Sequence, residues 1–214
     1  STLFQISQKS NKALLLLDLL GNIGLTRSNL RDPVGLLAFS DQIELFMKPK
    51  LGTSQVFYMA QQIFEKLALQ REFPARRTAD FSVPVLFMAS RLKMRHSVIV
   101  ISDVVDMLNN PKAVDFKLLR MLASKHDMMF FILDDPEEFK VRSPLGYIRI
   151  SDMETGKQTV ISARKAGAIR REIEESRGAL QYALKHRCGI DSVVLTPQNH
   201  HEELPKFLIS RTAR

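Results

Sequence analysis

The chain has 214 residues and a net charge of +8 at pH 7, from 31 Lys and Arg against 23 Asp and Glu. This length suits one α/β domain with a complete core, and 45% hydrophobic with 25% charged residues is ordinary for a globular protein. The single cysteine, Cys188, excludes an internal disulfide and a cysteine-based metal cluster. No apolar run approaches the roughly 20 residues that a membrane-spanning helix needs. The basic residues are spread without interleaved aromatic residues, so we expect no nucleic-acid partner.

The first part of the chain predicts a helix, a hairpin and two more helices. Residues 12–25 are apolar nearly all round and predict a buried helix. Residues 34–39 form an all-apolar strand, and residues 43–47 alternate as a half-exposed or edge strand does. Ser40 and Asp41 suit a tight hairpin between these two strands. The amphipathic helices that follow cover residues 54–69 and 81–92.

The rest of the chain alternates apolar strands with amphipathic helices. The predicted strands are 97–101, 128–133 and 192–195, and the predicted helices are 112–124, 163–186 and 200–209. Between them, residues 147–150 and 158–161 predict a small antiparallel hairpin with Gly156 in its turn. This alternation predicts one α/β domain, residues 1–214, with a doubly wound, mostly parallel sheet and helices on both faces. The early hairpin would be its one antiparallel edge.

The front of the chain departs from this pattern. Doubly wound folds usually open with a buried strand, yet no such strand precedes the first helix, and residues 2–6 are short and mixed. Either the domain starts with a helix, or a first strand is missing from this chain. The difference bears on function, because first strands often carry ligand-binding residues at their ends.

Residues 98–103, Val-Ile-Val-Ile-Ser-Asp, are the most informative stretch. Four β-branched residues in a row predict a strand buried on both faces. Ser102 and Asp103 then stand at its carboxyl end, where open α/β sheets bind ligands. A hydroxyl beside a carboxylate suits a hard cation such as Mg²⁺. A helix cap, the more common role of such residues, explains the same two residues.

Residues 32–41, Asp-Pro-Val-Gly-Leu-Leu-Ala-Phe-Ser-Asp, resemble the second strand and turn of a von Willebrand factor A-like domain. More narrowly, the chain resembles the bacterial MoxR-associated family, domain of unknown function fifty-eight. The resemblance covers essentially the whole chain in the right order. The other matching segments are residues 77–80, 97–106, 119–126, 133–137, 152–157 and 207–211.

The resemblance implies a von Willebrand A-like, Rossmann-like fold with a metal-ion-dependent adhesion site formed by three loops at the top of the sheet. By position, Thr78 matches the threonine loop, Asp103 matches the third loop, and Ser1 matches the last serine of the first motif. The aspartate and first serine of that motif are absent from this chain. We therefore expect Mg²⁺ to belong to the intact site and to bind this chain weakly or not at all.

The resemblance further implies a non-enzymatic module in the bacterial cytoplasm that docks a partner protein through the top of its sheet. The implied partner is a MoxR-type AAA+ ATPase, and the implied role is protein maturation or assembly. The alternative is a magnesium-dependent phosphohydrolase or nuclease. It would use a carboxylate cluster of Asp103, Asp106, Asp134 and Asp135.

The remaining polar residues have ordinary structural interpretations. Asp80 and Asp106 are expected as caps or as acceptors behind a site, and Asp134 and Asp135, before Pro136, as turn residues. The histidines show no set of three ligands at metal spacing. We expect the pair at 200–201 to start a helix and His96, His126 and His186 to lie on the surface.

Overall fold

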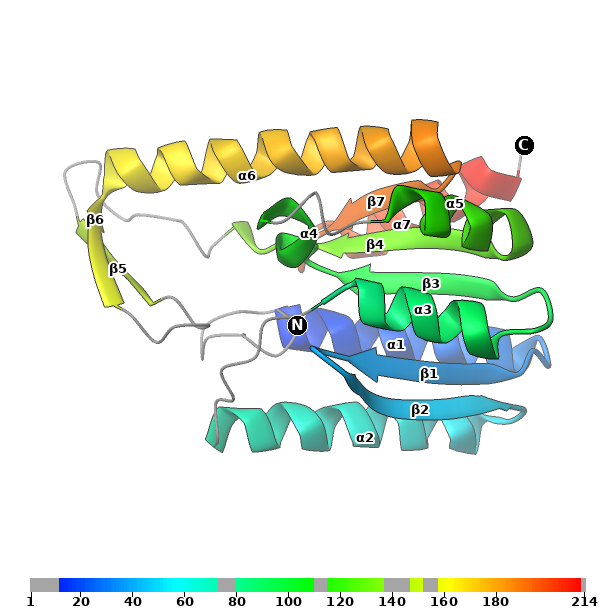
Figure 1. Ribbon diagram of the computed structural model, residues 1–214. Coiled ribbons are helices and arrows are strands. Elements are labelled where there is room, and N and C mark those ends of the chain that lie inside the picture. Colours follow the sequence, from blue (N-terminus) through cyan, green and yellow to red (C-terminus); the bar gives the residue numbers. More distant parts are fainter. Residues whose placement is uncertain (1–11, 73–79, 110–114, 137–146, 152–157, 213–214) are drawn as a thin grey trace.

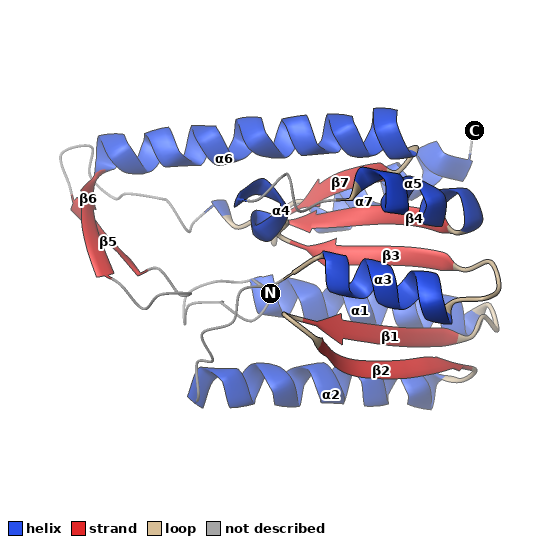
Figure 2. Ribbon diagram, viewed as in Figure 1, coloured by secondary structure: helices blue, strands red, loops and turns tan. Residues whose placement is uncertain are grey.

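The structure is a computed structural model that describes residues 12–72, 80–109, 115–136, 147–151 and 158–212. Figure 1 shows strands in the middle of an α/β arrangement, with helices in front of them and behind them. Figure 2 shows the same layers by secondary structure. Residues 2–6, on which the question of a first strand depends, lie outside the described residues. None of the described helices has both the length and the apolar character needed to cross a bilayer.

The central sheet is parallel and has three strands. They are β3 (Ser97–Ser102), β4 (Asp127–Leu133) and β7 (Asp191–Leu195), in the order β3-β4-β7. Ser102 pairs with Ile132 and Leu133 pairs with Leu195, so the three strands end together. We call this end the carboxyl edge.

The middle strand, β4, divides the core into two parts. Its side chains alternate between the two faces, as the period of a strand requires. Met128, Phe130 and Ile132 pack in one cluster with residues of the helices α3 (Ser82–Arg91), α4 (Val105–Asn109), α5 (Phe116–Lys125) and α6 (Ala163–Ala183). Met129, Phe131 and Leu133 pack in the other with residues of α1 (Lys12–Asn29), α2 (Thr53–Glu72) and α7 (His200–Thr212). The prediction of helices on both faces is confirmed.

The early hairpin forms a sheet of its own. β1 (Val34–Phe39) and β2 (Ile43–Lys50) pair in antiparallel fashion, and no ladder joins β1 to β3 in the described part of the chain. Gly35 is required there, because a Cβ would lie 2.7 Å from the carbonyl oxygen of Met47. The hairpin was predicted, but its place as an edge of the parallel sheet was not correct. Alternation identifies a strand without specifying its hydrogen-bonded neighbour.

The prediction that β3 is buried on both faces was wrong, and β4 is the strand that is buried in this way. In β3 only Val100 is fully buried, whereas every residue of β4 after Asp127 is buried. The reason is position, since in the described part of the chain β4 has a hydrogen-bonded strand on each side and β3 has one.

A second pair of strands stands apart from the central sheet. β5 (Tyr147–Ser151) and β6 (Gln158–Ser162) form the predicted antiparallel hairpin, whose turn, with Gly156, lies outside the described residues. Figure 1 shows this hairpin beyond the carboxyl edge, at the start of α6. The hydroxyl of Ser162 accepts a hydrogen bond from the backbone N–H of Lys165 and caps α6.

The helix predictions are confirmed with shifted ends. α1 continues to Asn29, and α5 begins at Phe116 after its cap, Asp115. α6 ends in a π-helical turn (Leu184–Cys188), which Gly189 closes with φ 71°. The short helix α4 was not predicted.

Candidate functional site at the carboxyl edge

The end of β3 makes a strained turn. The hydroxyl oxygen of Ser102 accepts the N–H of Val104 at 3.0 Å, and Oδ1 of Asp103 accepts the N–H of Val105 at 3.4 Å. Both side chains therefore cap the start of α4, as the alternative interpretation expected. Val104 is 1% exposed and has φ 56°, a left-handed conformation that is rare for a β-branched residue. Such strain costs about 1–3 kcal/mol and tends to gather at functional sites.

Asp103 is paired with a cation of the chain itself. Its Oδ2 lies 3.6 Å from Nζ of Lys12, the first residue of α1, and the two side chains are 5% and 9% exposed. The other predicted metal ligands, Ser1 and Thr78, lie outside the described residues. Mg²⁺ requires about six oxygens in octahedral geometry. One carboxylate that already faces an ammonium does not fit this requirement, so the described residues do not favour a Mg²⁺ site.

Asp134, at the end of β4, is held by two arginines of α6. Nη2 of Arg170 lies 2.6 Å from Oδ2 and Nη1 lies 3.2 Å from Oδ1, which is a bidentate contact. Nη1 and Nη2 of Arg177 lie 3.1 Å from Oδ2 and Oδ1. Burial disfavours the charged carboxylate, but the arginines outweigh this effect and keep the pKa of Asp134 below its ordinary value.

These contacts fix α6 against the carboxyl edge. Arg170 and Arg177 are two helical turns apart on one face of α6, and both reach the same buried carboxylate. The turns of α6 before Arg170 and the β5–β6 hairpin are thereby held out beyond the edge (Figure 1). Asp134 is a buried anchor and not the simple turn residue that was expected. The sequence signal was a pair of arginines seven residues apart on one side of an amphipathic helix.

The other predicted carboxylates have different roles. Oδ1 of Asp80 accepts the N–H of Ser82 at 2.9 Å, so the cap prediction for α3 is confirmed. Asp135 is completely buried, which corrects the expectation of an ordinary turn residue. The side chain of Asp106 lies outside the described residues. Among the side chains that the structure describes, no carboxylate cluster open to two metal ions is seen, because Asp103 and Asp134 each face cations of the chain.

One histidine prediction was wrong. His126 is 3% exposed, at the junction where α5 ends and β4 begins, and its Nδ1 accepts the N–H of His96 at 3.2 Å. Burial, with the charges of Lys125 and His96, lowers the pKa of His126. His186 is exposed as predicted. A charged neighbour in the sequence indicated a surface position, whereas the turn into the central strand buries the ring.

The helix start at 200–201 is confirmed, but these histidines do have a third potential ligand. Asp18 of α1 lies beside them, 182 residues from His200 in the sequence. The local signal was the carboxylate that interrupts the apolar run of the first helix, which does not by itself indicate its partners.

The family model described as protein of unknown function DUF58 matches residues 1–181. Comparison with curated proteins and with solved structures gave no match. Because the family match spans most of the chain, the chain belongs to the DUF58 family, domain of unknown function fifty-eight.

Proposed function

We propose that this chain is a non-enzymatic protein-interaction module of von Willebrand A type, which docks a partner protein at the carboxyl edge of its parallel sheet. One observation carries the proposal. The buried Asp134 binds both Arg170 and Arg177, so α6 and the β5–β6 hairpin are held beyond the edge at which the strands end. That arrangement frames a surface at the place where open α/β sheets bind their ligands.

The buried ion pairs make this surface rigid. Lys12 joins the start of α1 to the end of β3, and the Asp134 contacts join α6 to the end of β4. A surface ordered before binding loses less conformational entropy when a partner docks. The strained turn at Val104 is consistent with this role, because surrounding structure must hold it in place.

The charge at the start of α6, beside this surface, indicates the chemistry of the partner. Arg164 and Lys165 are exposed in the first turn of α6, on a chain with net charge +8. Complementary charge speeds association and selects partners, so we expect the partner to dock through an acidic surface of its own. The family resemblance suggests a MoxR-type AAA+ ATPase acting with this chain in protein maturation or assembly in the bacterial cytoplasm.

In this proposal Mg²⁺ does not take part in docking, because Lys12 already neutralises Asp103. The enzymatic alternative has less support. A two-metal hydrolase needs carboxylates that converge on two ions, whereas Asp134 is engaged by two guanidinium groups.

The experiment compares two charge reversals with the same change in net charge. The double variant Arg164→Glu, Lys165→Glu reverses the charge at the start of α6, beside the carboxyl edge. The control variant Lys93→Glu, Arg95→Glu reverses exposed charges before the opposite end of β3. Binding to a purified MoxR-type ATPase is measured by biolayer interferometry. We expect the first pair to weaken binding about 10-fold, mainly by slower association, and the control pair to change it little. Equal effects of the two pairs would contradict docking at this edge, and no binding by the unmodified chain would contradict this partner.

A further inference from the structure

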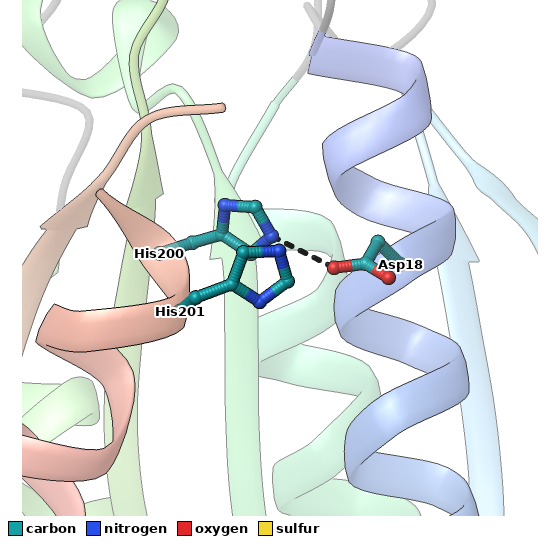
Figure 3. A group of neighbouring side chains, drawn as sticks. All are labelled: Asp18, His200 and His201. Carbon is teal, nitrogen blue, oxygen red and sulfur yellow. Dashed lines mark hydrogen bonds and ion pairs between the residues drawn. The ribbon is translucent and has the colours of Figure 1, made fainter. Parts of the chain in front are cut away.

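Asp18, His200 and His201 form a compact group between α1 and α7, as Figure 3 shows. One potential ligand atom from each residue lies within 4.8 Å of the other two. Asp18 comes from the middle of α1, and the two histidines are the first residues of α7. The group involves neither Asp103 nor Asp134 and is independent of the proposed function.

The hydrogen bonds of His200 determine which nitrogen carries its proton. Nδ1 lies 3.1 Å from the carbonyl oxygen of Thr196, which can only accept a hydrogen bond. Nδ1 is therefore the donor, and Nε2 of a neutral ring has a lone pair. That lone pair faces Oδ2 of Asp18 at 2.8 Å, so two acceptors meet at hydrogen-bonding distance. A cation must resolve this contact, either a second proton on the ring or a metal ion.

The surroundings favour a metal ion over a proton. A proton on Nε2 would satisfy His200 and Asp18 without involving His201, whereas a metal ion would be bound by all three side chains. The ring of His201 lies next to that of His200, with centroids 3.8 Å apart (Figure 3). A histidine whose other nitrogen donates to a backbone carbonyl is also oriented as metal-binding histidines usually are.

The turn before α7 holds His200 in this orientation. The N–H of Thr196 donates to the side-chain oxygen of Asn199 at 2.7 Å, and the N–H of Asn199 donates to the hydroxyl of Thr196 at 3.1 Å. The ring of His200 is buried, whereas the Asp18 side chain is 43% exposed and His201 is exposed. One ligand is thus fixed, and two can adjust to an ion arriving from solvent.

We propose that Asp18, His200 and His201 bind one Zn²⁺ ion. Two imidazoles and one carboxylate suit zinc and similar transition metals, whereas Mg²⁺ takes oxygen ligands. Ligand atoms around a tetrahedral Zn²⁺ are about 3.3 Å apart, which lies between the 2.8 Å from Asp18 to His200 and the 4.8 Å limit of the group, so small movements of the exposed Asp18 and His201 accommodate the ion. Three protein ligands leave a fourth position open at the surface. The ion would join α1 to α7 and stabilise the folded chain in proportion to its binding.

The test is calorimetric titration of the full chain with Zn²⁺, together with thermal unfolding. The variants are Asp18→Asn and His201→Ala, both at exposed positions, and His186→Ala serves as the control, an exposed histidine outside the group. We expect one Zn²⁺ per chain and a higher unfolding temperature with the ion. Each site variant should weaken binding at least about 10-fold, and the control variant should bind as the unmodified chain does.

Two results would overturn the proposal. One is no stoichiometric Zn²⁺ binding by the unmodified chain, which would identify the cation between Asp18 and His200 as a proton. The other is equal weakening by His186→Ala, which would show dispersed binding to surface histidines. Circular dichroism of each variant without metal shows whether the variant is folded.

Discussion

At the carboxyl edge of the sheet, Asp103 and Asp134 face ammonium and guanidinium groups that the chain itself supplies. On the surface between α1 and α7, Asp18 lies 2.8 Å from Nε2 of His200, a nitrogen that has a lone pair when the ring is neutral. Aspartate carboxylates therefore have two kinds of neighbour in this molecule, cationic side chains at the carboxyl edge and a histidine nitrogen between α1 and α7. The comparison teaches that a carboxylate at a strand end is no evidence for a metal site until its neighbours are known.

The largest expected effect is from removing the anchor at the carboxyl edge. Asp134→Ala leaves Arg170 and the buried Arg177 without their shared carboxylate. We expect the free energy of unfolding to fall by about 3–5 kcal/mol, because breaking a buried pair leaves an uncompensated charge. Urea denaturation measures this change. Asp32→Ala is the control, because the pair of Asp32 with Arg27 is about half exposed and should contribute at most about 1 kcal/mol. Similar losses in both variants would show that Asp134 is not an anchor.

A smaller effect is expected when Asp103 loses Lys12. Lys12→Met keeps the length of the side chain but removes the ammonium that faces the buried carboxylate. We expect the free energy of unfolding to fall by about 1–3 kcal/mol. Mg²⁺ should bind this variant more tightly than the unmodified chain, because the competing cation is gone.

Lys206→Met is the matched control for that substitution. Lys206 pairs with exposed glutamates of α7, so its loss should leave both stability and Mg²⁺ binding nearly unchanged. If Lys12→Met and Lys206→Met respond alike to Mg²⁺, the ammonium of Lys12 does not occupy the place of a metal ion.

The pH dependence of stability tests the role of Asp134 at the carboxyl edge. The folded-state pKa of Asp134 is lowered, so its ionic contacts stabilise the fold fully above the pKa of an unfolded Asp, about 3.9. This contribution is lost as the pH falls below that value and through the lower folded pKa. The stability difference between the unmodified chain and Asp134→Asn should therefore shrink in acid and stay constant near neutrality. Denaturation curves from neutral pH down to pH ~3 test this, and a difference that does not depend on pH would contradict it.

Much of the fold could be predicted from local patterns. The apolar runs at Val34–Phe39 and Asp127–Leu133 are strands, and the alternation of strands with amphipathic helices indicated layers on both faces of a parallel sheet. The strand pairs within the two hairpins could be predicted from their short connections, whereas the sheet that the early hairpin joins could not, because periodicity carries no information on it. The early hairpin is the example, since its two strands were recognised and its separation from β3 was not.

The polar contacts were harder to predict because they join distant parts of the chain. Arg170 lies 36 residues from Asp134, and His200 lies 182 residues from Asp18. No local spacing rule connects such pairs. The sequence did show one carboxylate that needs compensation when buried, because Asp134 directly follows the most apolar strand.

The most direct measurement of the central contrast is calorimetric titration of one sample of the unmodified chain, first with Mg²⁺ and then with Zn²⁺. The contrast between the two carboxylate regions predicts no stoichiometric Mg²⁺ binding, because Lys12 and the two arginines already neutralise the carboxyl edge. It predicts one Zn²⁺ ion bound at Asp18, His200 and His201. Tight, stoichiometric Mg²⁺ binding that Asp103→Asn abolishes would contradict it.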